Sequence, residues 1–390
     1  MSKLKKLYLD LCMCSIFRSM LDEPLFLFFR DYARAEEQDE KIKAYSAMAA
    51  EIYTFGGSLT DLVRKLVFEN ENVYIKSSAQ GKALPDEILL ALDRELSVIS
   101  EFASLSPDDF MLDMGLDYVS PFSHYSITLS EAYAERVENV DKYGFGVFSS
   151  GYMLRVDSDG KIVPITSPDK IALSHFIGYD EERKKVLDNT LAFVEGRPAQ
   201  NVLLCGDAGT GKSSTVKAVV NHLGGLGVRL IELRKDQLTV LPQVMGRISE
   251  IPLKFIIFID DLSFNKSDDN FSMLKAAREG SASARADNAL IYATSNRRHI
   301  VRENFEDRDG SDVHRNDAMQ EKLSLSERFG LVVYFGKPNK QLYLKIVHEL
   351  AERNNVTLDA DSLDVRAEEF ALRRGNRSAR CAEQFIKSIT

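Results

Sequence analysis

The 390-residue sequence has only four cysteines and six histidines. The cysteines are scattered along the chain and give neither a disulfide framework nor the paired spacings of a zinc site. The histidines show no HExxH or comparable ligand spacing, so no structural metal is expected. Thiols without a pairing pattern are typical of a reducing compartment, and we expect a cytoplasmic protein. The cysteines are Cys12, Cys14, Cys205 and Cys381.

Long hydrophobic runs are also missing. The N-terminal stretch MSKLKKLYLDLCMCSIF begins with lysines, as a secretory signal does, but Asp10 interrupts its apolar part and no small-residue cleavage site follows. The apolar run at 24–29, PLFLFF, is far shorter than the roughly 20 residues of a membrane-spanning helix. We therefore expect no membrane association, and we expect the run at 24–29 to lie in a core.

The sequence also lacks an excess of positive charge. Asp and Glu number 59 against 50 Lys and Arg, which gives a formal net charge of -9. This balance argues against broad binding of a nucleic-acid backbone, although a local basic patch stays open. With 44% hydrophobic and 28% charged residues the chain is typical of a globular protein, and its length favours two or more domains.

Residues 1–165 carry no chemical motif and are predicted to form a mainly helical N-terminal domain. Within them, DEILLALDRELSVISEF at 86–102 places five apolar residues on one helical stripe, which predicts packing. The segment YMLRVDSDGKIVPI has two β-like runs around Asp159 and Gly160, a dipeptide that favours a tight hairpin. We expect this hairpin to end the first domain. The stripe consists of Ile88, Leu89, Leu92, Leu96 and Ile99.

Beyond residue 165, strands alternate with helices, which predicts an α/β domain with a parallel sheet of five strands. This nucleotide-binding core is expected over 166–336. Pro338 and a following apolar stripe then begin a helical lid, expected over 337–390. The predicted strands are NVLLC from 201, VRLIEL from 228, KFIIFIDD from 254, ALIYATSN from 289 and LVVYF from 331.

The segment after the first of these strands fits the P-loop pattern GxxxxGK[ST]. In this pattern, backbone N–H groups cradle phosphates, the lysine neutralises their charge and the hydroxyl reaches a magnesium ion. The loop stands between an apolar run and a helical one, so the helix N-terminus adds its positive dipole end. The expected phosphate-binding residues are Gly206, Asp207, Ala208, Gly209, Thr210, Gly211, Lys212, Ser213 and Ser214.

A second acidic element belongs to the same pocket. Magnesium bound to a nucleotide is held by the P-loop hydroxyl together with an aspartate at the end of a nearby strand. The run FIIFIDDLSF supplies two such residues. Ser213 and Asp260 are the expected metal-site residues, and Asp261 is expected to polarise the attacking water. The predicted cofactors are therefore ATP and Mg²⁺.

These motifs resemble those of the AAA+ ATPases, and their order along the chain is the main support. FIGYDEER at 176–183 resembles the segment that borders the adenine, which implies contacts from Ile177 and Gly178. ATSN resembles sensor 1, which implies that Asn296 holds the lytic water. LSLSERFGL is similar to the box that carries the arginine finger, here Arg328, and RGNRSARCAEQFI resembles sensor 2, with Arg380.

The similarity is closer still to one bacterial group of predicted AAA+ ATPases classified only as a domain of unknown function. It covers about 174–390 and implies ATP binding and hydrolysis by an oligomer, without supplying a substrate. One departure concerns Asp261, because the usual AAA+ strand ends in Asp-Glu and aspartate is shorter by about 1.5 Å of reach. The replication-initiator branch also carries Asp-Asp, so the departure does not imply an inactive site.

Three functions follow as alternatives. The first is an ATPase that remodels or switches a macromolecular partner, with the N-terminal domain as the candidate for binding a protein partner and a homo-oligomer as the working assembly. The second is a nucleotide-dependent binding switch with negligible hydrolysis. The third is a DNA-associated initiator or helicase loader, which is not favoured because no helix-turn-helix or zinc module is evident.

Overall fold

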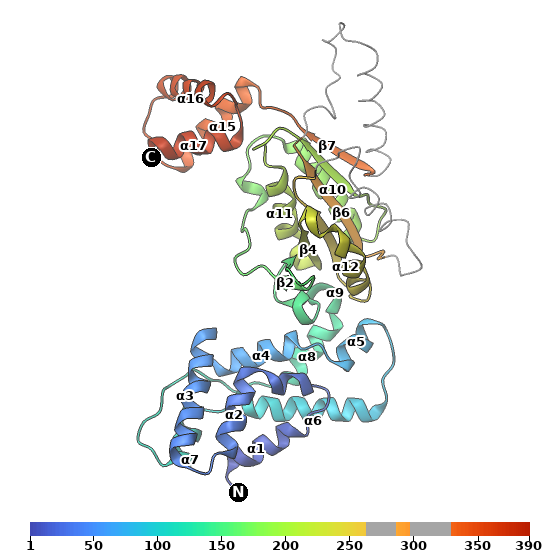
Figure 1. Cartoon of the computed structure of the whole chain (residues 1–390), viewed down its shortest axis with the longest axis vertical. Helices are drawn as coiled ribbons and strands as arrows, with labels where there is room; N and C mark the ends of the chain where they lie inside the picture. The colour runs from blue at the N-terminus through green and yellow to red at the C-terminus, as the bar shows by residue number, and fades with distance from the viewer. Residues whose placement is uncertain (263–285, 297–328) are drawn as a thin grey trace. The chain divides into compact units, whose positions relative to one another are not determined.

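The computed structural model of the chain describes residues 1–262, 286–296 and 329–390 (Figure 1). They form two compact units, Met1–Ser150 and Gly151–Thr390. None of the described helices is long and apolar enough to cross a membrane.

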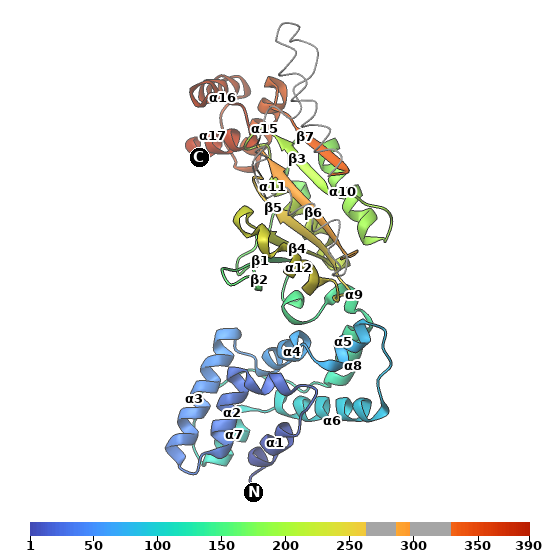
Figure 2. The ribbon, with the colours of Figure 1, turned by 45° about the vertical axis from the view of Figure 1, so that its right-hand side comes forward.

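Nine α-helices build the first unit, all of whose residues are described (Figure 2). Local sequence signals set several of their ends. Ser106 and Asp109 form a reciprocal capping box at the start of α7, Pro107 occupies its first turn, and Gly115 ends it in the left-handed conformation. The helices are α1 (Lys3–Cys12), α2 (Pro24–Arg34), α3 (Gln38–Phe55), α4 (Leu59–Glu69), α5 (Val73–Ala79), α6 (Asp86–Ala103), α7 (Pro107–Met114), α8 (Leu129–Glu138) and α9 (Val140–Tyr143).

An aromatic cluster forms the centre of this unit. The rings of Phe26 and Phe29, from the apolar run at 24–29, both pack against Phe102 of α6, with centroids 4.8 and 4.7 Å apart. The prediction that this run lies in a core is therefore confirmed. The predicted stripe on α6 is right except at Leu89, which is 44% exposed. Leu89 lies about 100° around the helix from Ile88, so only one of the two can face the core.

A seven-stranded sheet forms the centre of the second unit, in the order β2-β1-β4-β5-β6-β3-β7. The five strands predicted from the sequence are all present and pair in parallel, and β1 adds to them beside β4. The strands are β1 (Met153–Val156), β2 (Ile162–Pro164), β3 (Val202–Gly206), β4 (Val228–Leu233), β5 (Lys254–Ile259), β6 (Ala289–Ser295) and β7 (Leu331–Phe335).

The predicted hairpin is present, but it belongs to the second unit. β1 and β2 pair antiparallel around Gly160, whose φ of 79° suits the turn, and Asp157 accepts backbone N–H groups within it. On its other side β1 pairs in parallel with β4, with Met153 opposite Leu230. The boundary between the units therefore lies after Ser150 rather than at residue 165, because the hairpin completes the sheet of the core.

Helices cover the sheet and build the lid. α10 and α11 pack against each other, and between them they contact β4, β6 and β7. α15, α16 and α17 enclose a separate small core that includes Tyr343 and Phe385 (Figure 1). These helices are α10 (Asp180–Val194), α11 (Lys212–Leu223), α12 (Leu241–Ile248), α15 (Lys340–Arg353), α16 (Ala360–Arg374) and α17 (Ala379–Ile389). The alternation of strands and helices in the sequence also predicts a helix near 270–280, which lies outside the described residues.

The corrected boundary predicts how truncated chains behave. A fragment 151–390 should fold and bind Mg²⁺-ATP, whereas 166–390 should be destabilised by several kcal/mol. The shorter fragment loses the burial of Met153, Leu154 and Val156, each of which contributes about 1.5–3 kcal/mol. Thermal unfolding and calorimetric ATP titration of both fragments would test this. Equal melting temperatures would show that the hairpin is not an integral part of the core.

Candidate nucleotide-binding site

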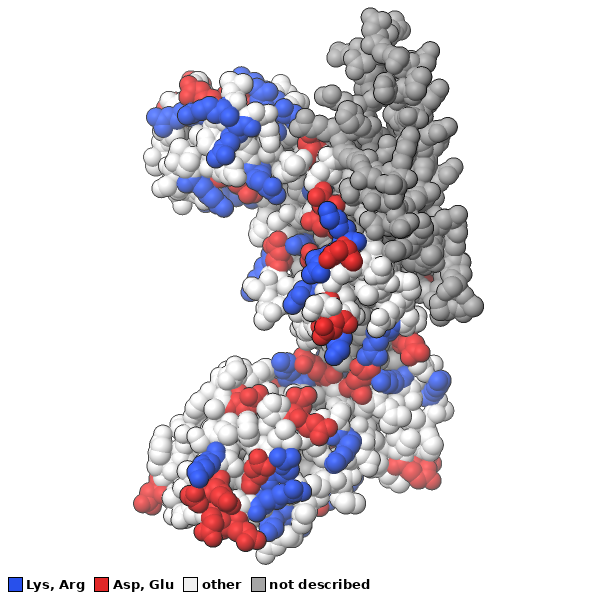
Figure 3. Space-filling model, viewed as in Figure 1, with Lys and Arg blue, Asp and Glu red and all other residues white. Residues whose placement is uncertain are grey.

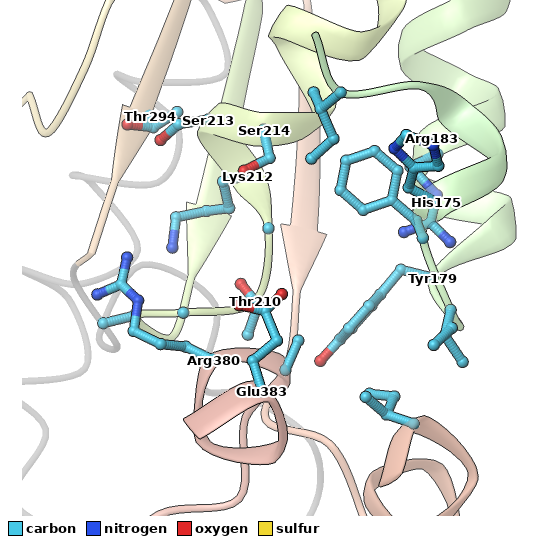
Figure 4. Close-up of a pocket in the computed structure, with 18 of the residues that line it drawn as sticks. His175, Tyr179, Arg183, Thr210, Lys212, Ser213, Ser214, Thr294, Arg380 and Glu383 are labelled. Carbon is cyan, nitrogen blue, oxygen red and sulfur yellow. The ribbon is translucent and has the colours of Figure 1, made fainter. Parts of the chain in front are cut away.

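A pocket of about 470 Å³ lies at the carboxyl ends of β3, β5 and β6, between the start of α11 and the lid (Figure 4). In open parallel sheets this edge is where ligands bind. Its lining residues come from six separate stretches of the chain. They are Ile171, His175, Phe176, Ile177, Tyr179, Arg183, Ala208, Gly209, Thr210, Gly211, Lys212, Ser213, Ser214, Asp260, Asp261, Thr294, Asn296, Ile346, Leu350, Ala379, Arg380 and Glu383.

The P-loop glycines have the backbone conformations that the loop requires. Gly206, Gly209 and Gly211 have φ values of 137°, 78° and 88°, which L-residues with side chains rarely adopt. A Cβ atom on Gly206 would lie 2.0 Å from the carbonyl oxygen of Phe335, so the start of the loop is pressed against the end of β7. Only glycine fits at this position, and the loop is held in place by the neighbouring strand.

Lys212 lies at the start of α11 with its ammonium group inside the loop. The residue is only 5% exposed, and Nζ donates to the carbonyl oxygens of Gly206 at 3.0 Å and Asp207 at 2.7 Å. Burial lowers the pKa of Lys212, while the charges of Asp207 and the Asp260–Asp261 pair oppose that shift. The loop therefore holds a cation that is poorly hydrated and available to an anion.

Thr294 of β6 joins the two aspartates that follow β5. Asp260 Oδ1 accepts from Ser213 Oγ at 2.6 Å and from Thr294 Oγ1 at 2.5 Å. The same threonine oxygen accepts the N–H of Asp261 at 2.9 Å. Both hydroxyls bind one oxygen of Asp260, and its second oxygen has no hydrogen bond with any of the described residues. The P-loop serine and a strand-end carboxylate thus stand together, as a magnesium site requires.

Asp261 lies next to the same position and is held by Asn296. Nδ2 of Asn296 donates to Oδ1 of Asp261 at 2.7 Å. Asp261 has a φ of 54°, a left-handed conformation that costs a residue with a side chain about 1–2 kcal/mol. Such local strain is found preferentially at functional sites, and here the contacts with Thr294 and Asn296 compensate for it.

The opposite side of the pocket is apolar and aromatic. Phe176 and Ile177 precede Gly178, which packs so closely on Leu342 of the lid that a Cβ atom would lie 2.3 Å from its Cδ1. Arg183 of α10 lies 4.9 Å above the Phe176 ring. Tyr179 donates from its hydroxyl to the carbonyl oxygen of Gly336 at 2.5 Å. A flat, apolar ligand group would find its surface here.

Helix α17 closes the pocket from the lid. Ser378 caps this helix with its side chain, and the backbone N–H of Arg380 approaches the carbonyl oxygen of Gly209 at 3.4 Å. Figure 4 shows Arg380 on the side of the pocket that carries Lys212, with Glu383 beside it. The lid and the P-loop are therefore in direct contact.

The structure brings together most of the residues that the sequence singled out. Ile177, the P-loop from Ala208 to Ser214, Asp260, Asp261, Asn296 and Arg380 all line the pocket. Gly178, Gly206 and Asp207 instead support its walls through backbone contacts. Arg328 lies outside the described residues.

Several pocket residues were not predicted from the sequence. Thr294 stands two positions before Asn296, so the two-residue period of a strand would have placed both on one face. Glu383 stands three positions after Arg380, which puts both on one side of a helix. Tyr179 follows Gly178 directly, within the FIGYDEER segment.

The donor set fits a magnesium-bound nucleoside triphosphate. Loop amides, a buried lysine and a helix N-terminus suit phosphates, and the Ser213–Asp260 pair suits a divalent cation that keeps waters and phosphate oxygens as its other ligands. The apolar wall suits a base, and the pocket volume is within the range of small-molecule sites.

A P-loop between β3 and α11, a parallel sheet and a helical lid in contact with the loop define a protein with the AAA+ P-loop fold. The chain belongs to the family described as "Protein of unknown function (DUF815)", whose model matches residues 150–390.

The solved structures that match the chain include two proteins of distant sequence. RuvB of Thermotoga maritima, described as a Holliday junction branch migration motor, is 14% identical with a TM-score of 0.35, over 56% of this chain and 71% of that one. The replication initiator DnaA bound to AMPPCP and single-stranded DNA is 18% identical with a TM-score of 0.39, over 58% and 66%. No curated protein matches the sequence.

Proposed function

We propose that this protein is a magnesium-dependent ATPase that uses ATP binding and hydrolysis to remodel or switch a macromolecular partner. The observation that carries the proposal is the convergence of Lys212, the Ser213–Asp260 pair and the Asp261–Asn296 pair on one pocket. Each group has a defined task in phosphoryl transfer, and their order around the pocket suits a bound triphosphate.

Binding would rely on groups that are already in place. The amides from Ala208 to Ser214 would receive phosphate oxygens, and Lys212 would exchange its two carbonyl contacts for them. Ser213 and Asp260 would hold the magnesium ion, which when bound screens the phosphate charge. The aromatic and apolar residues around Phe176 would cover the base.

Hydrolysis would depend on the residues beyond β5 and β6. Asp261 is fixed through one carboxylate oxygen by Asn296, which leaves the other to accept a hydrogen bond from a water molecule. Asn296 would position that water, and Arg380 would approach the phosphates from the lid. The resemblance to AAA+ proteins adds Arg328 from a neighbouring copy, so we propose a homo-oligomer.

The first unit would select the partner, and its charge favours a protein. Residues 1–150 contain 25 Asp and Glu against 15 Lys and Arg. On the face in Figure 3, acidic side chains gather over α3 and α7, whose first turns carry Asp39, Glu40, Asp108 and Asp109. An acidic surface repels phosphate backbones, so a DNA-associated initiator or loader is the less favoured alternative.

A nucleotide-dependent switch with negligible hydrolysis is the second candidate. The observation that favours it is Asp261, which stands where longer Glu is usual and has one oxygen already engaged by Asn296. Such a site could bind ATP firmly and turn over slowly.

All four cysteines are free thiols, which agrees with the cytoplasmic location that we propose.

Magnesium-ATP is expected to stabilise the folded protein. At a ligand concentration 100 times the dissociation constant, linkage gives about 2.7 kcal/mol. Lys212→Ala should remove most of this gain, because the variant lacks the buried cation that faces the phosphates. Melting curves recorded with and without Mg²⁺-ATP measure the effect.

Lys217→Ala is the matched control for this experiment. Lys217 lies on the same helix, α11, but does not line the pocket, so its variant should keep the full ATP-dependent shift. A melting shift that is the same in Lys212→Ala and in the unaltered protein would refute the site.

A further inference from the structure

Glu383 lines the pocket, but the proposed function gives its carboxylate no role in phosphate binding or hydrolysis. It lies on α17, one turn beyond Ala379 and Arg380, which also line the pocket. Figure 4 shows its side chain extending from the lid helix into the pocket, with Arg380 and Lys212 on one side and Tyr179 on the other. It therefore stands between the phosphate end and the aromatic end.

The carboxylate forms no hydrogen bond or ion pair with any of the described residues. Two other lid carboxylates do have partners, since Glu368 pairs with Arg377 and Asp364 lies 2.7 Å from His348. Glu383 is thus an acceptor directed into a cavity and left open there.

The negative charge of Glu383 determines which part of a bound nucleotide it can contact. An ionised carboxylate only accepts hydrogen bonds, so it repels phosphate oxygens and needs a donor. The base would lie on the apolar wall made by Phe176 and Ile177 with Ile346 and Leu350. Between base and phosphates lies the sugar, whose 2′ and 3′ hydroxyls are neighbouring donors that match two carboxylate oxygens.

Position along α17 supports the same assignment. The N-terminus of this helix meets the P-loop at Gly209, where the backbone N–H of Arg380 approaches the loop carbonyl. Glu383 is nearly one helical turn further, and a turn rises about 5.4 Å. That offset separates the backbone of Glu383 from the point where α17 meets the P-loop by about the length of one sugar ring.

We infer that Glu383 accepts hydrogen bonds from the ribose hydroxyls and makes the site selective for ribonucleotides over deoxyribonucleotides. This inference rests on the proposed nucleotide site and adds a determinant of sugar specificity to it. Carboxylates bind ribose hydroxyls in the same way in dinucleotide-binding folds. Because Glu383 is exposed, water can replace a lost contact and the selectivity should be moderate.

The test is calorimetric binding of Mg²⁺-ATP, 2′-deoxy-ATP, 3′-deoxy-ATP and GTP to the full chain. The unaltered protein should bind ATP about tenfold more tightly than either deoxy analogue, the effect of one hydrogen bond to a charged group. Glu383→Ala should bring both ratios close to one, and Glu383→Gln should give intermediate ratios because it keeps one acceptor. Removing a negative charge near the triphosphate changes the affinity for ATP and for its deoxy analogues alike. The ratio of the two affinities is therefore free of this general effect.

Gln384→Ala is the control, since Gln384 is the adjacent exposed residue and does not line the pocket. It should keep the ratios of the unaltered protein. If ATP binds but the deoxy ratios are the same with and without Glu383, the inference is overturned while the proposed function stands. A change confined to the ATP-to-GTP ratio would also overturn it, because it would place Glu383 at the base. If no nucleotide binds, both proposals fail.

Discussion

Asp261→Asn is expected to reduce phosphate release by about two to four orders of magnitude, the usual contribution of a group that accepts a proton from the nucleophile. The amide keeps the size of the side chain and can still bond to Asn296, but it cannot carry the negative charge that polarises water. ATP affinity should change little, because the effect is confined to the transition state. Steady-state phosphate release and calorimetric binding of ATP on the same preparation separate the two quantities.

Asp287→Asn provides the matched control for this substitution. Asp287 is exposed, precedes β6 at the opposite end from Asn296, and does not line the pocket. Its variant should keep full activity. An unaltered protein that binds ATP without turnover would instead support the binding switch. Turnover that survives in Asp261→Asn would remove Asp261 from the hydrolytic step.

Arg328→Ala is expected to lower turnover by about 10³ to 10⁵, the range for an arginine supplied to a transition state by a neighbouring molecule. This expectation follows from the resemblance of LSLSERFGL to the AAA+ arginine-finger box. ATP binding should be nearly intact, and specific activity of the unaltered protein should rise with its concentration.

Mixing variants distinguishes an arginine acting between copies from one acting within its own copy. Arg328→Ala mixed with Asp261→Asn should recover part of the activity, because a mixed interface can combine one intact arginine with one intact hydrolytic site. Arg366→Ala, an exposed arginine on α16 that does not line the pocket, should behave as the unaltered protein. Turnover that is independent of concentration and shows no recovery on mixing would contradict the proposal.

Local patterns in the sequence were sufficient for the five parallel strands and the P-loop. Strands such as β5 are covered on both faces and appear as unbroken apolar runs, as KFIIFI does. Spaced glycines followed by a lysine, placed between a strand and a helix, indicate a phosphate-binding loop with high specificity. These features depend on residues that are close together in the chain.

Features that depend on distant pairing were harder to predict. The turn at Asp159 and Gly160 indicated the hairpin, but only its pairing with β4 assigns it to the second unit. Thr294 looks like an ordinary residue of a buried strand. The pairing of β6 with β5 is what brings it to Asp260. Glu383 is an exposed helix charge, and only the contact of the lid with the P-loop shows that it also lines the pocket.

The close packing of Gly206 on Phe335 ties the phosphate loop to the chain that enters the lid. Phe335 ends β7, and the first lid helix begins at Lys340. At its middle, the loop also touches the last helix through Gly209 and Arg380. The loop is thus connected to the lid at two points. One is the end of β7, from which the chain enters the lid, and the other is the start of α17. The loop and the lid are therefore connected by backbone contacts at both points, independently of the side chains that line the pocket.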